Sequence, residues 1–88
     1  MRNSNYTRES SELLVFPQPL SDYVNVLFPN PNKSAYGFSL FDANGNKIKE
    51  MATEREYEFI IDREELTPGL YFFEIIGEKT FKGKIVVR

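Results

Sequence analysis

The fold of this chain is decided by the stretch Leu66-Thr-Pro-Gly-Leu-Tyr-Phe-Phe-Glu-Ile-Ile-Gly-Glu-Lys-Thr-Phe-Lys-Gly-Lys-Ile-Val-Val-Arg88. Apolar and polar residues alternate over residues 70–76 and again over residues 79–87, which predicts two β-strands. The short Gly77-Glu78 link between them favours a tight antiparallel hairpin. The sequence stops on the second strand, so we expect the end of that strand to be available to a partner.

The alternation also divides the side chains of this hairpin between two faces. We expect the core face to carry Tyr71, Phe73, Ile75, Phe81, Ile85 and Val87. The solvent face should carry Phe72, Glu74, Lys82, Lys84 and Arg88. Residues 79–88 contain four basic and no acidic residues, a charge of +4, so the other 78 residues sum to −6 to give the net charge of −2.

Five more short apolar runs that end at turn residues predict upstream strands, at residues 13–16, 23–28, 36–41, 47–50 and 57–62. No stretch has helical periodicity over a useful length, so the predicted fold class is all-β, a seven-stranded antiparallel Ig-like β-sandwich. Residues expected to share a face are Val24, Val26 and Phe28 in one strand and Tyr57, Phe59 and Ile61 in another, and Ile48 should point inward. Phe59, Tyr71, Phe73 and Phe81 should belong to one core.

A turn is predicted at Asp42-Ala-Asn-Gly45. The Asp42 side chain can accept a hydrogen bond from the backbone two residues on, which favours a type I turn with Gly45 left-handed and a bulged hairpin. A type I′ turn over Asn44 and Gly45 is the competing possibility. Oxygen ligands at alternate positions, Asp42, Asn44 and Asn46, also resemble part of a calcium loop, but no acidic residues follow at the required spacing.

Prolines mark two further turns. Pro17 and Pro19 cannot donate to a β-ladder, so they belong at a sheet edge or corner. Pro68 and Gly69 favour a type II turn, because proline fixes one φ and glycine supplies the positive one.

The composition argues against an enzyme. The 88 residues suffice for one domain and include no His, Cys or Trp, which removes most nucleophiles, general bases and soft metal ligands. The acidic residues between positions 54 and 65 alternate with apolar ones, as expected of a solvated strand and turn. We therefore expect no cofactor and no metal, and the negative net charge gives no support to nucleic-acid binding.

Two other readings concern the surface. Tyr23, Phe72 and Tyr36, if they point outward, could stack on sugar rings, as expected of a cell-surface adhesion or carbohydrate-binding Ig-like module. Lysines on the last strand can also serve to protect a sheet edge from unwanted pairing, which is compatible with a recognition role.

Four motifs occur in a fixed order along the chain. They are Pro17-Gln18-Pro19 followed by Ser21-Asp22-Tyr23, the turn from Asp42 to Gly45, Pro68-Gly69-Leu70-Tyr71, and the basic residues Lys82, Lys84 and Arg88. In this order they resemble the C-terminal sorting domain (type A) of type IX secretion system cargo proteins of Bacteroidetes. The resemblance covers residues 13–88, and Gln18 departs from it by replacing the family's asparagine.

The resemblance implies a non-catalytic signal that directs an upstream cargo protein through the periplasm to the outer-membrane surface or the medium. The implied partners are the outer-membrane translocon with its shuttle protein, and a sortase-like peptidase that removes the domain. The residues we expect the machinery to recognise are Pro68, Gly69, Tyr71, Lys82, Lys84 and Arg88. No nucleic acid and no membrane span are expected, and a homodimer formed by exchange of the first strand is possible.

Residues 1–12 are polar and lack a strand pattern, so we expect a flexible linker there, followed by the sorting domain at 13–88. The processing region is expected in this tail, around Ser4, Ser10 and Ser11, because an exposed segment without paired strands is readily cut.

Overall fold

The computed structural model describes residues 13–16, 22–54, 56–63 and 66–88. The corner at Pro17 and Pro19 and the processing region with Ser4, Ser10 and Ser11 lie outside the described residues. Within them the chain forms seven strands: β1 (Leu14–Phe16), β2 (Tyr23–Leu27), β3 (Ala35–Phe41), β4 (Lys47–Glu54), β5 (Glu58–Asp62), β6 (Gly69–Ile76) and β7 (Thr80–Val87).

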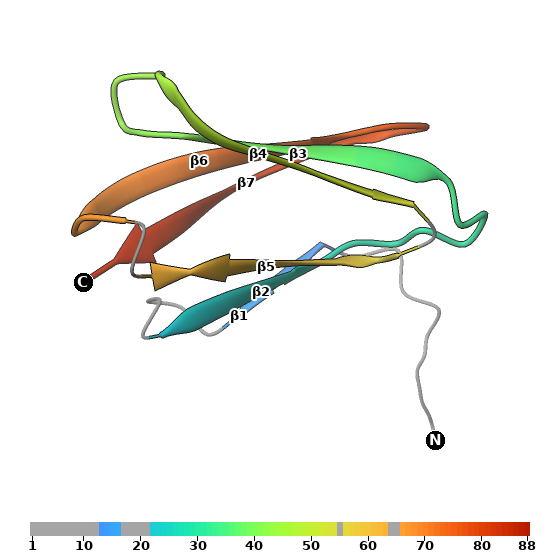
Figure 1. The fold of residues 1–88 in the computed structure, drawn as a ribbon, viewed down its shortest axis with the longest axis horizontal. Coiled ribbons are helices and arrows are strands. Elements are labelled where there is room, and N and C mark those ends of the chain that lie inside the picture. The colour runs from blue at the N-terminus through green and yellow to red at the C-terminus, as the bar shows by residue number, and fades with distance from the viewer. Residues whose placement is uncertain (1–12, 17–21, 55, 64–65) are drawn as a thin grey trace.

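The seven strands form two antiparallel sheets that face each other as layers (Figure 1). One sheet has the order β1-β2-β5 and the other the order β4-β3-β6-β7. Because β4 pairs with β3 and not with β5, the sheets correspond to A-B-E and C′-C-F-G of an Ig-like sandwich. The predicted all-β fold class and the number of strands are confirmed.

Strand β4 is longer than the sequence predicts. The prediction ended it at Glu50, whereas the strand continues to Glu54 and pairs with β3 along its whole length. Many side chains of an edge strand face water and are polar, so the apolar pattern by which a strand is recognised in the sequence is weak here.

The core lies between the two sheets. Its buried hydrophobic residues are Val24, Val26, Phe28, Tyr36, Phe38, Leu40, Phe59, Ile61, Leu66, Tyr71, Phe73, Ile75, Ile85 and Val87. Phe81 is partly buried and packs against this cluster. The predicted core face of the β6–β7 hairpin and the shared core of Phe59, Tyr71, Phe73 and Phe81 are therefore confirmed.

Aromatic rings run through this core from one sheet to the other. The ring of Phe59 lies 5.0 Å from that of Phe38 and 5.5 Å from that of Phe28, between centroids. Phe38 in turn stacks on Phe73 at 5.5 Å. Phe28 meets Tyr36 edge-on at 4.8 Å. Contacts of this kind stabilise a pair of rings by about 0.5–1.5 kcal/mol beyond the area they bury.

Two side chains, Ile48 and Tyr57, lie on a different side from the one predicted. Ile48 is 44% exposed. Its neighbour Lys49 pairs with the buried Leu40, so alternation directs Ile48 to the outer face, beside the register shift between Leu40 and Phe41. Tyr57 precedes β5 and is exposed, so it does not share the buried face with Phe59.

Tyr36, which was considered as an outward stacking residue, is buried. Its ring lies where a Cβ on Gly77 would be only 2.6 Å away, and its hydroxyl accepts a hydrogen bond of 3.3 Å from the Lys79 backbone N–H. Tyr36 therefore supports the β6–β7 turn from inside the molecule.

Neighbouring phenylalanines on β6 provide a test of this packing. We expect Phe73→Ala to lower the free energy of unfolding by about 3–5 kcal/mol, because it removes a buried ring and leaves a cavity. Phe72→Ala, on the exposed face of the same strand, should cost much less. Urea denaturation of both variants measures the difference, and equal midpoints would contradict the assignment of the two faces.

Candidate recognition surface

Two of the basic residues predicted for recognition, Lys82 and Lys84, lie on β7, an outermost strand of the four-stranded sheet, and the third, Arg88, directly follows it. Lys82 and Lys84 are exposed and alternate with Phe81, Gly83 and Ile85, so both lysines project from the outer face. Lys82 pairs with Glu74 across the hairpin, and their charged groups are 3.9 Å apart. Lys84 lies opposite Phe72.

The end of β7 approaches the turn that follows β5. The guanidinium of Arg63 donates a hydrogen bond to the backbone carbonyl of Arg88. The Arg88 side chain is exposed. From Lys82 to Arg88 the strand covers about 20 Å, so the three predicted basic residues form a stripe and not a pocket.

Pro68 and Gly69 lie beside this end of β7, since Gly69 pairs with Val87. Both are exposed. Gly69 has a positive φ of 151° and begins β6, so its backbone is more extended than in the predicted type II turn, which has φ of about 80° at this position. The β3–β4 turn is at the same end of the molecule as the last residue (Figure 1). The structure thus brings Pro68, Gly69 and Arg88 together and leaves Lys82 toward the other end of the sheet.

Tyr71 has a structural environment that differs from that of the exposed residues. Its ring is buried, and its hydroxyl donates to the Thr67 carbonyl at 2.6 Å while lying 3.1 Å from the Thr67 hydroxyl. A tyrosine near the start of the sixth strand that bonds back to the preceding corner is the tyrosine corner of Ig-like sandwiches. The motif Pro68-Gly69-Leu70-Tyr71 therefore fixes how the chain enters β6, and direct recognition of Tyr71 stays a prediction.

The Asp42 turn has the predicted hydrogen bonds. The Gly45 N–H donates to the Asp42 carbonyl at 3.0 Å, and Gly45 has φ of 88°. One carboxylate oxygen of Asp42 accepts the N–H groups of Asn44 and Asn46, each at 2.9 Å. The second oxygen accepts the Asn46 side-chain amide at 3.3 Å. Both carboxylate oxygens of Asp42 thus accept hydrogen bonds within the turn, the segment that was also considered as a calcium loop.

These donors lower the pKa of the Asp42 carboxyl below its ordinary value of 3.8. The backbone N–H of Asn46 is the largest cause, and desolvation, the next largest, partly opposes it. Among the described residues, no group of three or more His, Cys, Asp or Glu is arranged to hold a metal ion.

Two residues with clear structural roles, Gly83 and Asn30, were missed by the sequence reasoning. A Cβ on Gly83 would be 2.5 Å from the Phe73 ring, so glycine is needed to seat that ring under β7. The Asn30 amide donates to the Ser34 and Glu56 carbonyls, at 3.0 and 2.7 Å. These roles depend on partners distant in sequence, and the only local signal was a glycine inside a strand.

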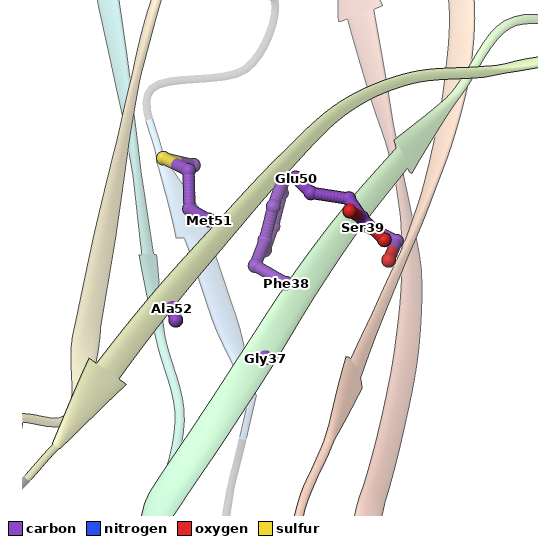
Figure 2. Close-up of a pocket in the computed structure, with 6 residues that line it drawn as sticks. All are labelled: Gly37, Phe38, Ser39, Glu50, Met51 and Ala52. Carbon is purple, nitrogen blue, oxygen red and sulfur yellow. The ribbon is translucent and has the colours of Figure 1, made fainter.

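The outer face also has a shallow hollow between β3 and β4 (Figure 2). Its floor is at Gly37 and Ala52, where side chains are absent or small. The Ser39 and Glu50 side chains project to one side of it, away from Met51 (Figure 2). The hollow has no cluster of reactive groups.

The family is defined by comparison with known proteins. Residues 14–88 match the model of the secretion system C-terminal sorting domain, named Por_Secre_tail. The chain belongs to this family, which contains the C-terminal sorting domains of type IX secretion. No curated protein matches the sequence. Within the described residues, no helix is long and apolar enough to span a membrane.

The tyrosine corner can be tested by removing one oxygen atom. We expect Tyr71→Phe to lower the free energy of unfolding by about 0.5–1.5 kcal/mol, the net value of a typical hydrogen bond, because the ring stays in place. Tyr57→Phe, at an exposed tyrosine outside the strands, is the matched control and should leave the urea midpoint nearly unchanged. An unchanged midpoint for Tyr71→Phe would show that the corner does not depend on its hydroxyl.

The Asp42 turn should make stability depend on pH. Because folding lowers the pKa of this carboxyl, its contribution is present above the ordinary value of 3.8 and is lost as the pH falls through the lowered pKa. Urea midpoints of the wild type and Asp42→Asn should therefore differ more at about pH 7 than at about pH 2. Asp22→Asn, at an exposed aspartate, controls for the loss of one negative charge. A difference that does not change with pH would contradict the role of the carboxylate.

Proposed function

We propose that this chain is a non-catalytic signal that directs an upstream cargo protein across the outer membrane through the type IX translocon and its shuttle protein. The observation that carries the proposal is the family match over residues 14–88. The basic stripe on an outermost strand supports it, because charge complementarity can steer the docking of a small rigid domain. The cargo is then secreted or held at the cell surface.

The adhesion or carbohydrate-binding alternative has less support. Tyr23 is on β2 and Phe72 on β6, so these exposed aromatics belong to different sheets. The two sheets face each other across the core, and their outer faces point in opposite directions (Figure 1). Tyr23 and Phe72 therefore do not form one stacking platform.

Processing is the second part of the proposal. A sortase-like peptidase would remove the domain at the cell surface by cutting between the cargo and the sandwich. Every described connection from β2 onward is short and tied to paired strands, whereas residues 1–12 are polar and have no strand pattern. We therefore propose a cut within or before residues 1–12.

A reporter fusion tests the function in cells that have a working type IX system. We expect a secreted reporter that carries the 88 residues at its end to reach the surface or the medium. The same fusion without residues 79–88 should accumulate in the periplasm, because β7 is missing. Intact mass and N-terminal sequencing of the released fragment should place the cut before residue 13. A reporter that reaches the surface with the whole domain still attached would contradict removal by a peptidase. Export of a reporter that lacks the 88 residues would contradict their role as an export signal.

A further inference from the structure

The turn between β3 and β4 contains an asparagine followed directly by a glycine, Asn44 and Gly45. Asparagine is a chemically labile residue, because the backbone nitrogen of the next residue can attack its side-chain amide. A glycine in that next position has no Cβ, so it leaves the approach of its nitrogen unhindered. The other asparagines in the described part of the chain precede larger residues, which are Val26, Pro31, Lys33 and Lys47.

The side-chain amide of Asn44 is open to such an attack. Asn44 is exposed, and no hydrogen bond among the described residues involves its side chain. The amide of the neighbouring Asn46, in contrast, donates to the Asp42 carboxylate at 3.3 Å. A Cβ built on Gly45 would meet no atom within 4 Å, so the space beside this residue is open to water.

The attacking nitrogen is held by the turn. The Gly45 N–H donates to the Asp42 carbonyl at 3.0 Å, and the Asp42 N–H donates to the Asn46 carbonyl at 2.9 Å. The Asp42 carboxylate accepts the N–H groups of Asn44 and Asn46, each at 2.9 Å. These bonds fix the backbone on both sides of Gly45. Its nitrogen is therefore free to lose its proton and rotate toward the Asn44 side chain only when the turn opens locally.

We propose that Asn44 is a site of spontaneous deamidation, which the closed Asp42 turn suppresses and each local opening of the turn permits. The reactants are the Asn44 side chain, the Gly45 backbone and water. The reaction is a property of the turn itself and does not depend on the function proposed above.

The reaction has two steps. In the first, a base in the solvent takes the proton of the Gly45 N–H, and the nitrogen forms a bond to Cγ of Asn44. The Cγ–Nδ2 bond breaks, Nδ2 takes up a proton and leaves as ammonia, and a succinimide ring remains. In the second, water adds to one of the ring carbonyl carbons and breaks its bond to the Gly45 nitrogen. Addition at Cγ gives aspartate, and addition at the backbone carbonyl of residue 44 gives isoaspartate. No group is oxidised or reduced.

Neither product fits the turn as well as asparagine. Both add a carboxylate close to that of Asp42, and like charges repel. In isoaspartate the main chain also runs through the side-chain carbons of residue 44, which lengthens it inside a turn that joins two paired strands. A modified turn therefore closes less readily, and the extent of deamidation records how long the turn has been open.

Peptide mass spectrometry of the 88-residue chain, incubated at neutral pH and physiological temperature, tests the site. In guanidinium chloride, which opens the turn, we expect Asn44 to deamidate before Asn46 and to give both aspartate and isoaspartate. Without denaturant, deamidation of Asn44 should be about tenfold slower or more, which corresponds to an opening cost of at least about 1.4 kcal/mol. Equal rates in the two conditions would overturn protection by the turn. A rate at Asn44 no higher than at Asn46 in guanidinium chloride would overturn the site.

The role of Asp42 is tested by Asp42→Ala, which removes the carboxylate and keeps the Asn44–Gly45 pair. We expect this variant to deamidate up to about tenfold faster than the wild type, because it loses hydrogen bonds to a charged acceptor. Asp22→Ala, at an exposed aspartate outside the strands, is the matched control and should keep the wild-type rate. Circular dichroism and urea midpoints establish that both variants are folded. A wild-type rate in folded Asp42→Ala would overturn the role of the carboxylate.

Hydrogen exchange tests the same mechanism without a variant. Urea below the unfolding transition should speed exchange of the wild-type Gly45 amide and deamidation of Asn44 by the same factor, because both require the turn to open. Faster exchange of the Gly45 amide without faster deamidation would overturn the proposal.

Discussion

The contact of aromatic rings between the two sheets is the interaction on which the rest of this molecule depends. Phe59 and Phe28 come from the three-stranded side, and Phe38, Tyr36 and Phe73 come from the four-stranded side. A domain of this size buries a limited share of its surface, so large rings provide much of the apolar area that is available. Their edge-on and stacked packing also restricts the spacing of the sheets. The outer strands are therefore presented by a rigid body.

This packing also holds in place the basic residues of β7 that are proposed for recognition. The Phe73 ring lies under Gly83, between the two lysines of the strand. The β6–β7 turn rests on Tyr36, and the end of β7 is bonded to Arg63. The strand is thus held from its inner side and at both ends, which keeps its outer side chains in a defined position. Preorganisation of this kind lowers the entropic cost of binding a partner.

Three of the four motifs found in the sequence divide into two groups with different roles. The Asp42 turn and the Tyr71 corner direct their polar groups to their own backbone, so these residues specify how the chain folds. Lys82, Lys84 and Arg88 are exposed and present charge to the solvent. A sequence motif cannot distinguish these roles, because both require particular residues at particular spacings. Burial and hydrogen-bond partners distinguish them.

The sequence by itself determined the all-β class, the β6–β7 hairpin with its two faces, and the turn at Asp42. These features follow from alternation and from turn chemistry, which act between residues close together in the chain. Only the tertiary structure decided that Ile48 is exposed at a bulge, that Tyr36 is buried, and that Gly83 makes room for Phe73. Each depends on a contact between strands whose register is set by the packing of both sheets, and no local pattern carries that information.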